Sequence, residues 1–178
     1  NEPSFEKDTK GIGVTGICGS GIIEVIAEMY LSGVLSQDGV INGELVTKSK
    51  HIIAEGRTFS YVLSSGKHMI KVTQNDVRAI QLAKAALYAG IRLLMERMEI
   101  EAVDRIRLAG AFGSHIDVKY AMVLGLIPDC DLEQVSSAGN AAGTGARIAL
   151  LNYKSRQEIE EIVREVEKVE TAVETKRR

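Results

Sequence analysis

The hydrophobic and polar positions of the chain follow two different periods, and the longest regular stretch has the period of a helix. Between residues 73 and 98 apolar residues recur every three or four positions, at Val77, Ile80, Leu87, Ile91, Leu94 and Met98. This spacing places them on one face of a helix. Thr73 is a good N-cap and Asp76 stands in the first turn, so the pattern predicts a long helix that begins after Thr73.

Other segments alternate with period two or form short apolar runs. Residues 58–63 and 68–73 alternate and are separated by a loop at 64–67, which predicts an antiparallel hairpin. Short strands are predicted at 106–110 and 135–138. Helical spacing is found at 22–30, 117–125, 140–151 and 155–167. Because short helices alternate with these two strands, we expect βαβ units with the strands parallel.

The last part of the chain carries two further patterns. The helix at 155–167 is charged, and Ile159, Ile162 and Val166 form the stripe that we expect to be buried. Residues 168–174 alternate, which predicts an edge strand.

Three glycine-rich corners stand out from this framework, at 15–21, 110–114 and 137–146. The first and third run into helices, and the second follows a short apolar strand. Glycine lets the backbone approach a ligand closely, and the first N–H groups of a helix are unpaired and attract anions. Ligands of open α/β sheets bind beyond the carboxyl ends of strands, so these corners are the candidate site.

One literal motif is set aside. Residues 11–16 read GIGVTG and match the dinucleotide fingerprint GxGxxG. The fingerprint needs a hydrophobic strand before it and a helix that opens within it. Here the preceding residues 6–10 are polar, so a dinucleotide site is not predicted.

Composition narrows the function classes. The chain has 178 residues, 45% of them hydrophobic and 26% charged, with a net charge of -2. This balance gives no support for nucleic-acid binding, and no apolar run reaches the roughly 20 residues of a membrane span. The two cysteines, Cys18 and Cys130, form no CxxC pair, and the three histidines show no metal-ligand spacing. We therefore predict no metal site and a reducing, cytoplasmic location.

The predicted organisation has three parts. Residues 1–10 are polar and read as a flexible leader or a fragment boundary, residues 11–173 form the domain, and residues 174–178 form a charged tail. The first ordered-looking segment is very short. We therefore expect the chain to be part of a longer protein.

Five segments carry a resemblance to a known family: GICGSGIIEVIAE (16–28), TQNDVRAIQLAKAALYAGI (73–91), LAGAFGS (108–114), GLIPD (125–129) and GNAAGTGARIAL (139–150). Their order and spacing resemble the C-terminal ASKHA domain of the iron–sulfur reductive activators of corrinoid proteins. ASKHA denotes the superfamily of acetate and sugar kinases, heat-shock chaperone ATPases and actin. The resemblance implies an α/β, actin-like (ribonuclease H-like) ATPase lobe with a mixed sheet. Its adenosine motif usually has two adjacent glycines, whereas here the second is Ala111.

The resemblance also implies an activity and its cofactors. Such activators use ATP to return cob(II)amide to cob(I)amide on a corrinoid methyl-transfer protein. ATP or ADP with Mg²⁺ would bind between this lobe and a first ASKHA lobe that the sequence lacks. A two-iron two-sulfur cluster would lie in an N-terminal ferredoxin-like domain, since this chain offers no set of four cysteine ligands. The implied partners are the corrinoid protein and those missing domains, and a homodimer stays open.

The expected contacts to the nucleotide follow from the glycine corners and the resemblance. Gly19, Ser20 and Gly21 would face phosphate or ribose, unless they form only a tight turn with Ser20 as N-cap. Gly110, Ala111, Phe112, Gly113 and Ser114 would form the floor beneath the nucleoside. Phe112 either packs on the adenine ring or fills the core, and Asn140 either braces the pocket or caps its helix. No catalytic residue is predicted.

Two other functions stay open at this point. A docking module would bind a partner through the alanine-rich helix 79–90. A hydrolase would use Cys18 in the turn Gly16–Gly19 as nucleophile, activated by the histidine at 51, 68 or 115. As one lobe of a two-lobed enzyme, the fragment alone is expected to be inactive.

Overall fold

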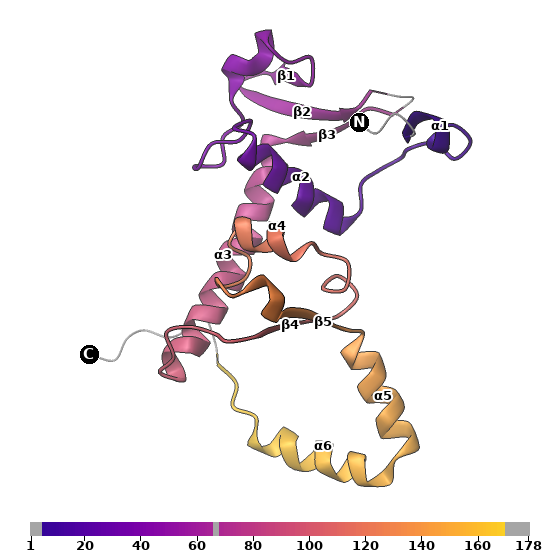
Figure 1. Ribbon diagram of the computed structural model, residues 1–178, viewed down its shortest axis with the longest axis vertical. Helices are drawn as coiled ribbons and strands as arrows, with labels where there is room; N and C mark the ends of the chain where they lie inside the picture. The colour runs from indigo at the N-terminus through magenta and orange to yellow at the C-terminus, as the bar shows by residue number, and fades with distance from the viewer. Residues whose placement is uncertain (1–4, 66–67, 170–178) are drawn as a thin grey trace. The chain divides into compact units, whose positions relative to one another are not determined.

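The computed structural model describes residues 5–65 and 68–169 of the chain (Figure 1). These residues divide into two compact units, 1–83 and 84–178, and each is described by itself. The boundary lies within the long helix α3 (Gln74–Arg97). None of the helices in the described ranges is long and apolar enough to cross a membrane.

The first unit is built on a three-stranded antiparallel sheet with the order β1-β2-β3. The predicted hairpin is confirmed as β2 (Thr58–Ser64) and β3 (Ile70–Thr73), which pair antiparallel. The sequence analysis missed β1 (Ile52–Glu55), which pairs with β2. Only two residues of β1 are strongly apolar, and the link to β2 is a tight turn in which Gly56 has a φ of +62°. So short a strand gives almost no periodic signal.

Helix α2 (Gly19–Leu31) supplies much of the core of the first unit. Its buried residues recur at helical spacing and are Ile23, Ile26, Ala27 and Met29. Ser32 forms the C-cap, and Gly33 follows in the left-handed region with a φ of +74°, which glycine adopts without strain. Ahead of α2 lies the short helix α1 (Phe5–Thr9), inside the segment expected to be a leader. The 3-10 helix η1 (Gly43–Thr47) follows α2 along the chain.

The start of α3 is the predicted one. The amide and hydroxyl of Thr73 both donate to Asp76 Oδ2, at 2.8 and 2.7 Å, and the amide of Asp76 donates back to Thr73 Oγ1 at 3.2 Å. This reciprocal pair satisfies backbone donors that a helix start leaves unpaired. Val77 is only 1% exposed and anchors this end of the helix in the first unit.

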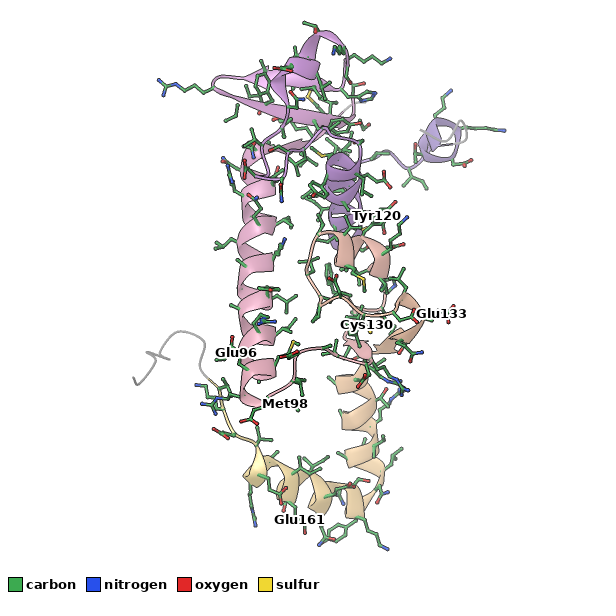
Figure 2. All side chains as sticks on the ribbon, turned by 60° about the vertical axis from the view of Figure 1, so that its left-hand side comes forward. Glu96, Met98, Tyr120, Cys130, Glu133 and Glu161 are labelled. Carbon is green, nitrogen blue, oxygen red and sulfur yellow. The ribbon has the colours of Figure 1, made fainter. Side chains whose placement is uncertain are left out.

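The second unit contains the parallel pair predicted from the sequence. β4 (Ile106–Ala109) and β5 (Val135–Gly139) run parallel and form a two-stranded sheet. The fold is thus α/β with both kinds of pairing as expected, but the antiparallel and parallel pairs lie in two separate sheets and not in one mixed sheet. Between the strands lie α4 (Val118–Val123) and the 3-10 helix η2 (Leu132–Gln134), and after them come α5 (Ala141–Leu151) and α6 (Tyr153–Glu165). Figure 2 shows Tyr120 on α4 and Glu161 on α6.

The prediction that the apolar stripe of α6 is buried is wrong for this chain. The stripe of α6 is exposed, at 43% for Ile159, 52% for Ile162 and 67% for Val166. On α3, Leu94 and Met98 are also exposed, at 49% and 68%. Amphipathic spacing shows only that a face can be buried, whereas burial needs a second surface. The described elements leave these faces largely uncovered.

The predicted edge strand at 168–174 is not formed where it can be judged. Residues 166–169 have no regular structure, and 170–174 lie outside the described residues together with the rest of the tail.

Candidate functional site

The candidate floor is the place where β4 and β5 end side by side (Figure 1). The pairing shifts register between Leu108 and Ala109, because Leu108 pairs with Ser137 whereas Ala109 pairs with Gly139. β5 therefore carries one extra residue, Ala138, which is a β-bulge. The Ser137 hydroxyl accepts a hydrogen bond of 3.1 Å from the amide of Gly139. This amide therefore has a partner although the bulge interrupts the regular strand pairing.

Both strands then leave the sheet through glycine. Gly110 has a φ of +102° and Gly139 a φ of +61°, a region that residues with a side chain rarely adopt. The amide of Gly110 donates to the carbonyl of Gly139 at 2.8 Å, which joins the two turns. A Cβ built on either glycine would meet no atom within 4 Å, so the space beside both turns is open.

The loop after Gly110 folds back tightly on itself. The carbonyl of Gly110 accepts two hydrogen bonds from Ser114, at 3.1 Å from the amide and 2.9 Å from the hydroxyl. A Cβ on Gly113 would lie 3.1 Å from the carbonyl oxygen of Ala109 and 3.2 Å from the carbonyl carbon of Leu108. Gly113 is therefore the residue that lets the loop lie against the end of β4.

Phe112 lies at the tip of this loop and is 53% exposed. Of the two alternatives for Phe112, filling the core is wrong for this chain, because Phe112 is not among the few buried residues of the second unit. Those residues are Met95, Ala121, Leu126 and Ile127. Ala111, Ser114 and His115 are exposed as well. The five predicted floor residues thus form one continuous, largely exposed loop.

Asn140 follows Gly139 directly and is the N-cap of α5. Its side-chain oxygen accepts a hydrogen bond of 2.9 Å from the amide of Gly143. A Cβ on Gly143 would lie 2.7 Å from Asn140 Nδ2, so the cap needs glycine at that position. Of the two roles expected for Asn140, the structure shows capping. Through the Gly110–Gly139 hydrogen bond, this helix start lies next to the floor loop.

The remaining predicted residues, Gly19, Ser20 and Gly21, lie in the first unit. They form the first turn of α2, but the N-cap is Cys18, not Ser20 as the turn alternative held. Cys18 precedes the first helical residue with extended backbone, and its Sγ accepts a hydrogen bond of 3.4 Å from the amide of Gly21. Sulfur is an uncommon N-cap acceptor, so the sequence alone favoured the hydroxyl of Ser20 as the cap.

The thiol of Cys18 is exposed and has a lowered pKa. Its Sγ lies 3.3 Å from the Ser20 hydroxyl. This hydrogen bond first, and the one from the Gly21 amide second, lower the pKa of the Cys18 thiol below its usual value. A thiolate nucleophile is normally activated by a neighbouring base. Two of the candidate bases have other partners, because His51 Nδ1 lies 2.8 Å from the Val62 carbonyl and His115 Nδ1 lies 2.8 Å from that of Ala111.

The second cysteine, Cys130, is partly buried and donates a hydrogen bond to the backbone. Cys130 lies in the segment that leads to η2 and β5 (Figure 2), and its thiol donates to the Asp104 carbonyl at 3.5 Å. Within residues 5–65 and 68–169, no group of three or more His, Cys, Asp or Glu side chains is arranged to hold a metal ion.

Comparison with known proteins decides the family. Residues 2–177 match the family model described as the C-terminal domain of RACo, the ASKHA domain. The chain belongs to this family. Its parallel strands, glycine turns and capped α5 are therefore parts of an ASKHA domain, and the resemblance seen in the sequence is confirmed.

Two relatives extend this result. The corrinoid activation enzyme RamQ of Eubacterium limosum is 42% identical over 150 residues, which cover 77% of this chain and 25% of that protein. A solved structure of a reductive activator for a corrinoid, iron–sulfur protein superposes with a TM-score of 0.78 at 33% identity, covering 89% of this chain and 26% of that chain. The ASKHA domain described here thus spans about a quarter of the length of these relatives.

Proposed function

We propose that this ASKHA domain is the nucleotide-binding C-terminal lobe of an ATP-dependent reductive activator that returns cob(II)amide to cob(I)amide on a corrinoid protein. The family and the two relatives, both named for corrinoid activation, support this activity. Nucleotide binding is supported by one observation. The glycine turns at Gly110 and Gly139 are joined by a hydrogen bond and lie beside open space at the ends of two parallel strands. In α/β folds this is where ligands bind.

The floor of the nucleoside would be the loop Gly110–Ser114. The φ of +102° at Gly110 and the open space beside it leave room for a flat group to approach the backbone. Phe112 is exposed on the same loop, so its ring is free to pack against a base. Ala111 replaces the second glycine of the usual motif, and because it is exposed its methyl group does not close the loop.

The other two corners would assist in different ways. The side-chain oxygen of Asn140 accepts a hydrogen bond from the Gly143 amide. The proposed contribution of Asn140 is therefore to fix the start of α5 beside the floor. Gly19, Ser20 and Gly21 begin α2, and the early N–H groups of a helix attract phosphate oxygens. The Gly21 amide already donates to Cys18. The amides of Gly19 and Ser20 are thus the proposed donors to phosphate or ribose.

ATP supplies the driving force in this scheme. Electron transfer to the low-potential Co(II)/Co(I) couple is uphill, and a nucleotide can drive it only if its bound states favour different conformations of the activator and its partner. This domain would hold the adenosine and part of the phosphate chain. Mg²⁺ and the group that positions the attacking water would belong to another lobe of the longer protein.

The iron–sulfur cluster of the proposed activator would also lie elsewhere in the longer protein. This chain has two cysteines, and a two-iron cluster needs four ligands. Both Cys18 and Cys130 are free thiols, the state expected in a reducing compartment, so the proposal puts the protein in the cytoplasm. The proposed partners are a corrinoid protein and the remaining domains, with no nucleic acid.

A second candidate function, a partner-docking module, is supported by one observation. Three apolar side chains of α3 are exposed, Leu82 at 74%, Leu87 at 47% and Tyr88 at 49%. Exposed apolar groups that gather into a patch are typical of interaction sites, and these three side chains come from the same helix. Docking on α3 does not exclude nucleotide binding at Gly110–Ser114. The two functions differ in whether nucleotide binds at all.

The test uses the full-length protein that contains this chain. Cobalt reduction on a corrinoid protein is followed by its absorption spectrum, with an electron donor present and with or without ATP. We expect reduction only with ATP, and calorimetry should show binding of ADP and ATP. A protein that binds neither nucleotide would overturn the proposal and leave the docking function.

A further inference from the structure

One side chain next to the loop Gly110–Ser114 has no role in the proposed nucleotide site. The ring of His115 is exposed at the end of the loop, and its Nδ1 lies 2.8 Å from the carbonyl oxygen of Ala111. A carbonyl oxygen only accepts hydrogen bonds, so Nδ1 carries the proton and donates it. In the neutral ring, Nε2 is then the unprotonated nitrogen.

The carbonyl of Ala111 belongs to the peptide that joins Ala111 to Phe112. A hydrogen bond on that oxygen fixes the rotation of the peptide plane, and the plane sets the direction in which the Phe112 side chain leaves the backbone. The neighbouring peptides are held by other groups. Ser114 bonds to the carbonyl of Gly110, and the amides of His115 and Ile116 donate to the carbonyl of Phe112 at 3.1 and 3.2 Å. The side chain of His115 therefore holds the one peptide that lies between them.

Phe112 needs such a support because packing does not supply it. It is 53% exposed, so contacts with neighbouring side chains constrain it weakly. An exposed aromatic side chain samples several rotamers and loses this freedom when a ligand stacks on it. A loop that is already fixed in the bound geometry lowers the cost of binding.

We infer that His115 is a positioning residue for the nucleoside: its Nδ1–H bond to the Ala111 carbonyl fixes the Ala111–Phe112 peptide and thereby presents Phe112 to the base. This inference rests on the proposed nucleotide site at Gly110–Ser114. It assigns His115 no contact with the nucleotide and no proton transfer.

The first test exploits the shapes of two amides in the full-length protein. In asparagine the side-chain nitrogen can occupy the position of histidine Nδ1, whereas in glutamine it occupies the position of Nε2. We expect His115→Asn to keep the wild-type Kd for ADP, and His115→Gln and His115→Ala to raise it roughly three- to tenfold, the effect of one lost hydrogen bond. Weak binding by His115→Asn together with wild-type binding by His115→Gln would mean that Nε2 contacts the ligand, and would overturn the inference.

The second test asks whether His115 acts through Phe112. In a double-mutant cycle, His115→Ala should weaken ADP binding in the wild-type protein but have no further effect in Phe112→Ala. Additive effects would overturn the inference. As a control, the Kd for inorganic pyrophosphate, which lacks the base, should be the same in wild type and His115→Ala. Melting temperatures measured alongside separate this effect from a loss of the fold.

The outcomes distinguish the inference from the function on which it rests. If the wild-type protein binds no ADP, the proposed function fails and the positioning role fails with it. If the wild type binds ADP and His115→Ala binds it equally well, only the positioning role fails.

Discussion

The amide of Gly110 donates a hydrogen bond of 2.8 Å to the carbonyl of Gly139. It joins two residues that lie 29 positions apart in the sequence and that both have positive φ, +102° and +61°. A Cβ added to either glycine would meet no atom within 4 Å. A substitution would therefore be opposed by backbone strain at positive φ and not by a steric clash. Backbone conformation thus sets the shape of the proposed floor.

The first prediction concerns this strain. We expect Gly110→Val to abolish nucleotide binding in the full-length protein, because a branched side chain disfavours the φ of +102° and projects into the open space proposed for the nucleoside. The strain should cost about 1–3 kcal/mol of stability, which leaves the protein folded. Calorimetric titration with ADP measures the loss.

A matched control for that substitution lies in α5. A Cβ on Gly145 also meets no atom within 4 Å, but Gly145 lies inside the helix and has no positive φ. Gly145→Val should therefore bind nucleotide like the wild type. Unchanged ATP affinity in a folded Gly110→Val protein would remove the loop Gly110–Ser114 as the main site.

The second prediction separates capping from binding at Asn140. Asn140→Ala removes the acceptor for the Gly143 amide and should destabilise the protein by about 1 kcal/mol, a fall in Tm of roughly 2–4 °C for a chain of this size. Asn140→Asp keeps the acceptor and should melt like the wild type. The Kd for ADP should stay near the wild-type value in Asn140→Asp, which keeps the cap that fixes the start of α5. A large loss of affinity in Asn140→Asp would instead point to direct contact between the amide and the nucleotide.

The third prediction concerns the thiol of Cys18. Because the Ser20 hydroxyl and the Gly21 amide lower the pKa of Cys18, more thiolate is present near neutral pH than in an ordinary exposed cysteine. Iodoacetamide should therefore modify Cys18 faster than Cys130. Ser20→Ala should raise the pKa of Cys18, so its alkylation profile should move to higher pH while that of Cys130 stays in place.

The same shift gives a direction for stability. A group with a lowered pKa in the folded state stabilises the fold only where it is ionised, so the contribution of Cys18 is absent at low pH. It grows as the pH rises through the folded pKa and is complete above the ordinary pKa near 9.0. Equal alkylation rates for Cys18 and Cys130 at every pH would contradict this account.

The fourth prediction concerns residues 1–178 alone. We expect no ATPase activity and weak nucleotide affinity, because phosphoryl transfer needs charge neutralisation from both sides of the nucleotide. The chain spans about a quarter of the length of its relatives. Phosphate release and calorimetry on the purified chain check this. Turnover at the rate of the full-length protein would place the catalytic groups within these residues and refute the two-lobe scheme.

Sequence reasoning succeeded where the signal is local. The N-cap pair Thr73 and Asp76 follows from short-range backbone preferences, and the parallel pairing of β4 and β5 follows from the short helical segment that connects them. It failed where the outcome depends on what lies across from a residue. Phe112 and the α6 stripe are exposed because the described elements leave them largely uncovered, and periodicity carries no information about such partners.

It also could not resolve competition between neighbouring residues of similar chemistry. Cys18 and Ser20 can both accept a hydrogen bond at the start of α2, and the choice depends on where the first helical turn begins. Helix starts shift by a residue or two without a change in the apolar pattern. The bulge at Ala138 was missed for a related reason, since one extra residue in a strand leaves no mark in so short an alternation.

That extra residue makes the length of β5 as important as its composition. Substitutions at Ala138 leave the backbone count intact, so Gly139 still reaches its position opposite Ala109. Deletion of Ala138 would make Gly139 follow Ser137 directly in a regular ladder, and the bulge that now precedes the φ of +61° at Gly139 and its hydrogen bond to Gly110 would be lost. Among related proteins, gaps should therefore be far rarer in this strand than changes of side chain.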